Sequence, residues 1–101
     1  LVSFRERVRI DGADVDEAAV ATGVPVVLTA AERTGYAVTF FEATWALAAL
    51  LFERAGVDIV IWEVGLGGRL DATNAIEPRA SAVERQMSRR PSPSTSTAYC
   101  R

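Results

Sequence analysis

Hydrophobic and polar positions divide the start of the chain into short segments. From Phe4 to Ile10 they alternate, which is typical of a partly exposed strand, and the Asp11-Gly12 pair that follows is a turn signal. Residues 14–21 are acidic and rich in alanine, which fits one or two helical turns. Residues 25–31 are compatible with either a strand or a helix, and Gly35 ends them.

A hydrophobic helix is predicted next. Thr39 and Glu42 have the spacing of a capping box, in which the Thr side chain accepts a hydrogen bond from a backbone N–H three residues on and the Glu side chain reaches back. Residues 43–54 are mostly strong helix formers, and Gly56 is placed as a stop. Because hydrophobic residues lie on nearly all sides of this helix, we expect other elements to cover more than one of its faces.

The run from Val57 to Trp62 predicts a strand. It is rich in β-branched residues and lies between Gly56 and the glycines that begin at Gly65, the profile of a strand buried on both faces in a parallel sheet. A second strand is expected to begin at residues 80–83, after a connection too short for a full helix. The sequence therefore predicts an α/β fold built on part of a parallel sheet.

The composition changes at Glu84. Residues 1–83 carry seven Arg and twelve Asp or Glu, a net charge of −5, whereas residues 84–101 carry four Arg and one Glu, a net charge of +3. The second stretch is rich in Arg, Ser, Pro and Thr, a composition that we expect to have no fixed structure. We therefore assign residues 1–83 to part of one domain and residues 84–101 to a disordered tail, and we hypothesise that this tail is an out-of-frame reading of a GC-rich gene.

Composition also limits the possible chemistry. The chain has no His and no Lys, which leaves carboxylates, Arg, hydroxyls and backbone groups. Cys100 is the only cysteine, which excludes an internal disulfide and a cysteine-based zinc site. The net charge of −2 favours neither nucleic acid nor a membrane as partner, and charged residues interrupt the longest hydrophobic region before it reaches the ~20 residues that span a bilayer. We expect a cytoplasmic protein.

Glu63 is the first candidate for chemistry, because it follows the predicted strand directly and precedes Gly65, Gly67 and Gly68. In an open parallel sheet, ligands bind beyond the carboxyl ends of the strands, where a carboxylate can hold a Mg²⁺ ion that bridges nucleotide phosphates. The glycines would let the backbone approach a ligand, and Arg69 would neutralise an anion. A carboxylate that caps a neighbouring helix accounts for the same pattern about equally well.

Three strings of sequence add to this pattern. LVSFRERVRIDG spans Leu1 to Gly12, VTFFE spans Val38 to Glu42, and EVGLGGRLDATN spans Glu63 to Asn74. In this order they resemble the folylpolyglutamate synthase/dihydrofolate synthase branch of the Mur-ligase superfamily. The resemblance implies a P-loop-type central domain and an ATP- and Mg²⁺-dependent ligase. Such an enzyme phosphorylates a carboxylate of dihydropteroate or a folate, and the amine of L-glutamate then displaces the phosphate.

The resemblance also assigns roles to individual residues. Glu63 matches the Mg²⁺-binding glutamate of the family. Positions that bind the pterin or pteroate part of the substrate correspond to Thr39, Phe40, Phe41, Glu42, Leu70 and Asp71. Phenylalanine rings offer a stacking face to a flat heterocycle, and polar groups can satisfy its nitrogens. Purely structural roles stay open as well, since capping alone accounts for Thr39 and Glu42 and a place in the core accounts for Phe40 and Phe41.

By the same resemblance, much of the enzyme lies outside this sequence. A glycine-rich phosphate loop with a lysine and a Ser-Pro-His would precede Leu1, and an Asp-His and a glutamate-binding domain would follow. Since the chain also begins without a methionine, we expect an internal fragment, inactive alone, of an enzyme that is a monomer at full length. Two alternatives are another Mur-type amide ligase and a small non-catalytic binding module.

Overall fold

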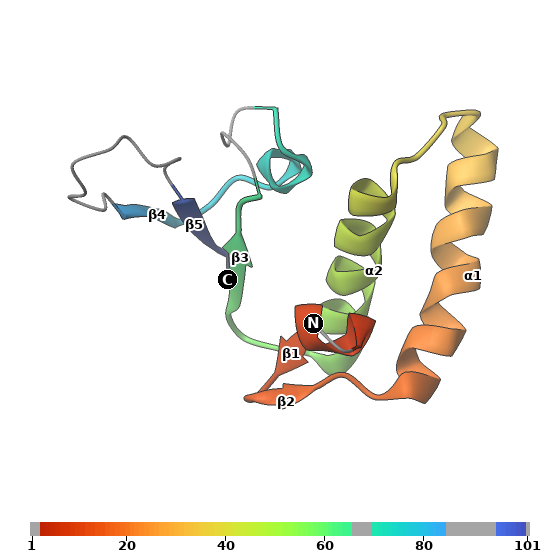
Figure 1. Cartoon of the computed structure of the whole chain (residues 1–101), viewed down its shortest axis with the longest axis horizontal. Coiled ribbons are helices and arrows are strands. Elements are labelled where there is room, and N and C mark those ends of the chain that lie inside the picture. The colour runs from red at the N-terminus through yellow and green to blue at the C-terminus, as the bar shows by residue number, and fades with distance from the viewer. Residues whose placement is uncertain (1–2, 66–69, 85–94, 101) are drawn as a thin grey trace. The chain divides into compact units, whose positions relative to one another are not determined.

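The computed structural model describes residues 3–65, 70–84 and 95–100. The chain forms two compact units, Leu1–Val57 and Asp58–Arg101. The first unit contains helices and a small hairpin, and the second contains three strands (Figure 1). None of the helices in the described ranges has the length and hydrophobicity needed to cross a membrane.

A short 3-10 helix and a hairpin begin the first unit. Helix η1 covers Phe4–Arg7, and strands β1 (Arg9–Ile10) and β2 (Ala13–Asp14) pair antiparallel. The predicted strand over residues 4–10 is therefore wrong for its first half, where a capping box between Ser3 and Glu6 stabilises the helical turn. The predicted turn is confirmed: Asp11 and Gly12 have φ values of 51° and 80°, as a tight hairpin turn of type I′ requires.

Two helices complete this unit. Helix α1 covers Glu17–Thr34 and helix α2 covers Phe40–Ala55. The structure decides the ambiguity over residues 25–31 in favour of helix, even though Pro25 cannot donate a backbone hydrogen bond inside α1. Both helices end as predicted, at Gly35 and Gly56, whose φ values of 66° and 63° are left-handed and suit glycine.

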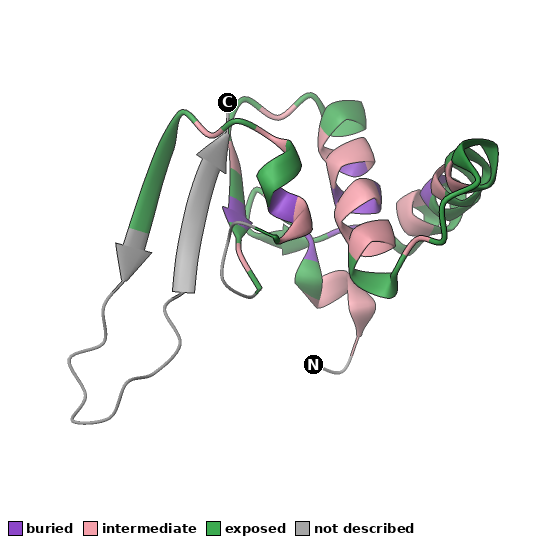
Figure 2. Ribbon diagram, turned by 90° about the horizontal axis from the view of Figure 1, so that it is seen from above, coloured by how far each residue is buried: buried purple, intermediate pink, exposed green. Residues whose placement is uncertain are grey.

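The core of this unit lies between the helices. Leu47, Ala48 and Leu51 of α2 are buried, and α1 contributes Gly23, its only buried residue. A Cβ atom at Gly23 would lie 2.6 Å from Cδ1 of Leu47, so the missing side chain allows the close approach. Most of the surface of α1 is exposed (Figure 2). Residues 42–52 of α2 are all buried or half-buried, as expected for a helix covered on more than one face.

The second unit is a three-stranded sheet. It contains β3 (Val60–Glu63), the 3-10 helix η2 (Ala72–Ala75), β4 (Ala80–Glu84) and β5 (Thr95–Cys100). The strand order is β3-β5-β4, and β5 runs antiparallel to both neighbours. The predicted second strand is confirmed by β4, and the connection before it contains no full helix in its described part.

Three predictions about this unit are corrected. The neighbouring strands are antiparallel rather than parallel, and residues 95–100 of the expected disordered tail form β5. A parallel pair needs a crossover connection, usually a helix, whereas β5 supplies antiparallel partners to β3 and β4 at once. Burial of β3 on both faces is also wrong, because Trp62 is 9% exposed but Ile61 is 60% exposed.

Candidate functional site

The predicted pterin-binding segment begins at the N-terminus of α2. The backbone N–H and the hydroxyl of Thr39 both donate to Oε2 of Glu42, each at 2.8 Å, and the N–H of Glu42 donates to Oγ1 of Thr39 at 3.2 Å. This is the predicted capping box. The N–H of Thr39, and then its hydroxyl, lower the pKa of Glu42 below its ordinary value of 4.5. Oε1 of Glu42 takes part in none of these bonds.

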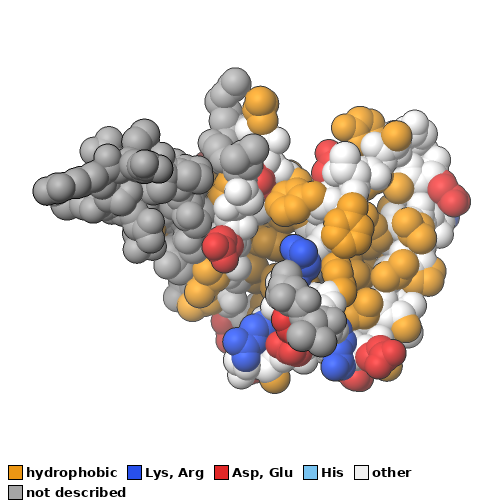
Figure 3. Space-filling model, in the orientation of Figure 1, with side chains coloured by type: hydrophobic (Ala, Val, Ile, Leu, Met, Phe, Trp, Pro, Cys, Tyr) orange, Lys and Arg blue, Asp and Glu red, His pale blue; other side chains and the backbone are white. Residues whose placement is uncertain are grey.

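The two phenylalanines of this segment are not core residues. Phe40 is 73% exposed and Phe41 is 42% exposed. The Phe40 ring lies edge-to-face against Phe4 of η1, with ring centroids 6.4 Å apart and planes at 77°. Hydrophobic side chains gather over the two helices on the face shown in Figure 3. The aromatic surface near the start of α2 is therefore accessible to a flat ligand.

Glu63 occupies the place predicted for it. It is the last residue of β3 and is exposed. Among the described residues, its carboxylate takes part in no hydrogen bond or ion pair. Gly65 lies two residues further on, whereas Gly67, Gly68 and Arg69 of the glycine-rich segment predicted to approach a ligand lie outside the described residues. Glu63 thus ends a strand with its oxygens free of partners in the described structure.

Asp71 uses its carboxylate locally. Oδ2 accepts a hydrogen bond from the N–H of Gly65 at 3.1 Å, and Oδ1 accepts from the N–H and the hydroxyl of Thr73 at 3.0 and 2.7 Å. These bonds cap η2 and tie it to the end of β3. The neighbouring Leu70 is 87% exposed. Of the two predicted pocket residues in this loop, Leu70 has the free side chain.

The described residues include no cluster of three or more acidic, His or Cys side chains that could form a complete metal cage. Glu63 alone still suits Mg²⁺, which commonly keeps several waters and binds one or two carboxylates together with substrate phosphates. Its exposed, unpartnered carboxylate is the donor that such a site needs. The chain can therefore supply one ligand of a Mg²⁺–nucleotide complex.

The structure brings together only some of the predicted residues. Thr39 to Glu42 lie in the first unit, and Glu63, Leu70 and Asp71 lie in the second. Sequence reasoning missed Phe4 and Thr73. An Asp two positions before a Thr is a recognisable capping pattern, which would have found Thr73. The contact of Phe4 with Phe40 joins residues distant in sequence and has no local signal.

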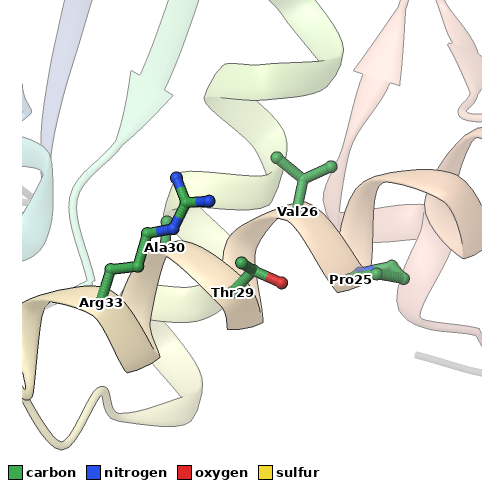
Figure 4. A pocket seen from close by; sticks show the side chains of 5 residues that line it. All are labelled: Pro25, Val26, Thr29, Ala30 and Arg33. Carbon is green, nitrogen blue, oxygen red and sulfur yellow. The ribbon is translucent and has the colours of Figure 1, made fainter.

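A shallow hollow lies elsewhere, on α1. It is lined by Pro25, Val26, Thr29, Ala30 and Arg33, all from one face of that helix (Figure 4). The view shows the side chain of Arg33 extending from one end of this row. None of the predicted site residues lines it.

The chain resembles proteins whose names agree with one another. It is 49% identical over 83 residues to a probable bifunctional folylpolyglutamate synthase/dihydropteroate synthase of Haloferax volcanii. It is 41% identical over 83 residues to the dihydrofolate synthase/folylpolyglutamate synthase of Escherichia coli, and 36% identical over 88 residues to a folylpolyglutamate synthase of Lacticaseibacillus casei. These matches cover 78%, 82% and 82% of the chain, respectively.

The same matches cover little of the relatives. The chain spans 10% of the Haloferax protein, 19% of the Escherichia protein and 21% of the Lacticaseibacillus protein. No family model matches the chain, and no solved structure matches it.

Proposed function

We propose that the chain belongs to the folylpolyglutamate synthase/dihydrofolate synthase family. It would form part of the ATP-binding domain of a cytoplasmic, monomeric ligase that adds L-glutamate to dihydropteroate or a folate. The observation that carries the proposal is the identity of 36–49% with relatives named for this activity. The alignments include 78–82% of the chain.

The proposed reaction has two steps. A carboxylate oxygen of the substrate attacks the γ-phosphorus of ATP, and ADP leaves with the electrons of the broken P–O bond. The amine of L-glutamate then attacks the acyl carbon, phosphate leaves, and the amine nitrogen loses a proton as the amide forms. Mg²⁺ neutralises charge on the phosphates when it is bound. Glu63 contributes a carboxylate to that ion, supported by its exposed position at the end of β3.

The substrate's flat ring is assigned to the aromatic and polar surface around the start of α2. Phe40 and Phe41 offer exposed ring faces for stacking. Oε1 of Glu42 and the hydroxyl oxygen of Thr39 are proposed to accept hydrogen bonds from ring N–H groups. Leu70 adds an exposed hydrophobic side chain, and Asp71 supports the neighbouring backbone. Thr39 to Glu42 are proposed to form one wall of a pteroate pocket, and Leu70 and Asp71 are proposed as pteroate-binding residues of the second unit.

The fold proposal extends to the full-length enzyme. Strands β3 and β4 each run antiparallel to β5, so they run in the same direction as one another. That is the relation required of two strands in a parallel, Mur-ligase-type sheet, in which ligands gather at the carboxyl ends. Glu63 lies at such an end.

A chimaera tests this function. Residues 1–83 would replace the matching stretch of the Escherichia coli enzyme, with which the chain is 41% identical. We expect ATP-dependent incorporation of labelled glutamate into dihydropteroate, and a loss of about 100-fold or more in kcat in Glu63→Gln. Glu53→Gln, an exposed Glu of α2, is the matched control. A chimaera that folds but transfers no glutamate would contradict the proposal, and full activity in Glu63→Gln would remove Glu63 from it.

A further inference from the structure

The contact between Phe4 and Phe40 joins two parts of the first unit that are distant in sequence. Phe4 belongs to η1, whereas Phe40 is the first residue of α2. Their rings meet edge-to-face at a centroid distance of 6.4 Å, the arrangement that the quadrupoles of aromatic rings favour.

Local bonds hold the backbone that carries Phe4. The N–H of Ser3 donates to Oε1 of Glu6 at 3.1 Å, and the N–H of Arg5 donates to Oγ of Ser3 at 3.3 Å. Val8, directly after η1, is buried, and its carbonyl accepts a hydrogen bond from the N–H of Val15 at 3.1 Å. Phe4, which is only half-buried, therefore extends from a well-fixed turn.

The contact with Phe4 restricts the conformational freedom of the Phe40 side chain. A side chain that is 73% exposed at the first position of a helix has few contacts of its own and would populate several rotamers. An edge-to-face contact on one side restricts that freedom but leaves much of the ring in solvent. A ring fixed in this way can stack on a ligand without losing further conformational entropy on binding.

We propose that Phe4 is a positioning residue, which holds the Phe40 ring in the orientation that stacks on the flat heterocycle of a pterin-class ligand. The inference rests on the proposed function for the identity of the ligand. It rests on the Phe4–Phe40 geometry alone for the fixing of the ring.

Four forms of the 101-residue chain test it: the parent, Phe4→Leu, Phe4→Tyr and, as a matched control at the other end of α2, Phe52→Leu. NMR couplings and ring-current shifts report the rotamer of Phe40, and equilibrium dialysis reports the affinity for pteroic acid. We expect Phe4→Leu to average the Phe40 rotamers and weaken binding about 3- to 10-fold. Phe4→Tyr keeps the aromatic ring, so the Phe40 rotamer and the affinity for pteroic acid should match those of the parent. Phe52→Leu should change neither the rotamer nor the affinity.

The two readouts separate the inference from the function on which it rests. If Phe40 keeps its rotamer in Phe4→Leu, the positioning role is wrong, whatever the affinity. If Phe40 loses its rotamer and the parent chain binds no pteroic acid, the positioning role stands and the ligand assignment fails. If Phe52→Leu weakens binding as much as Phe4→Leu, the effect is one of general stability and the inference is overturned.

Discussion

The two units of the molecule differ in what determines their structure. In Leu1–Val57, helix ends coincide with capping residues and glycines, and buried leucines of α2 pack against Gly23 of α1. In Asp58–Arg101, β3 follows a β-branched run, but β3 and β4 both find their partner in β5, nearer the C-terminal end of the chain. Capping residues close in sequence thus determine where the helices end. The pairing of a strand depends instead on which other strand folding brings beside it.

The largest expected effect comes from removing the shared strand. A chain ending at Glu84 loses β5 and with it every backbone partner of β3 and β4 in the described sheet. We expect the amides of Val60–Glu63 to exchange with solvent at rates near those of an unfolded chain, while amides of α2 keep their protection. Hydrogen exchange measured by NMR checks this. Persistent protection in both strands would mean that β3 and β4 pair directly with each other.

The core of the helical unit gives the next largest effect. Leu51 is 3% exposed, and Leu51→Ala should lower the free energy of unfolding by about 2–5 kcal/mol. Ile61 of β3 is 60% exposed, so Ile61→Ala should cost no more than about 0.5 kcal/mol. Urea unfolding followed by circular dichroism measures both. Equal losses would show that the exposed face of β3 is covered in solution.

Helix α2, the ends of both helices and the position of Glu63 were predictable from sequence, whereas the single helix α1 over Glu17–Thr34 was not. The capping box at Thr39, the left-handed stops at Gly35 and Gly56, and the place of Glu63 at a strand end all follow from local rules. The first half of the predicted N-terminal strand failed for a local reason as well. A Ser–Glu capping box over η1 outweighed the alternation of hydrophobic residues there.

The sheet could not be predicted because its partners are set by non-local pairing. Parallel order was inferred from the composition of residues 57–62, which describes burial and says nothing of direction. The exposed Ile61 shows that this burial is itself absent on one face. Similarly, the Phe4–Phe40 contact and the bonds of Asp71 depend on segments brought together by folding. The residue types predicted which side chains belong to the candidate site. They did not predict which atoms of those side chains already take part in hydrogen bonds.

The hydrogen bonds of Asp71 are expected to stabilise the loop in the second unit. Its carboxylate uses one oxygen for Gly65 and the other for Thr73, whereas an amide side chain has a single acceptor oxygen. Asp71→Asn should therefore break one of the two links and destabilise the loop locally by about 1–2 kcal/mol. Faster amide exchange at Gly65 or Thr73 would show it. Asp58→Asn, a matched change at an exposed Asp, should leave both amides unaffected.

In the first unit, the hydrogen bonds between Thr39 and Glu42 cap α2. Thr39→Ala removes the acceptor of the Glu42 N–H and a donor to the Glu42 carboxylate, which should lower stability by about 1 kcal/mol. Thr44→Ala is the control, because that hydroxyl donates to the carbonyl of Phe40 inside the helix, where alanine is well tolerated. Thermal unfolding compares the two. A cost in Thr44→Ala as large as in Thr39→Ala would contradict a capping role.

The smallest expected effect is the dependence of this cap on pH. The Thr39 N–H, and then its hydroxyl, stabilise ionised Glu42, so the pKa of Glu42 is lower in the folded chain than its ordinary value of 4.5. A group with a lowered folded pKa adds stability above its unfolded pKa, and that stability is lost as pH falls through the folded pKa. We therefore expect the start of α2 to fray below about pH 4.5.

An NMR titration of the Glu42 side chain measures this pKa directly. In Thr39→Ala the hydroxyl donor is gone, so the midpoint of Glu42 should move back toward 4.5 while the remaining backbone N–H keeps part of the shift. An unchanged midpoint would assign the whole shift to the backbone bond. A midpoint above 4.5 in the parent chain would mean that the carboxylate is not held by the cap, and would leave both of its oxygens free for a ligand.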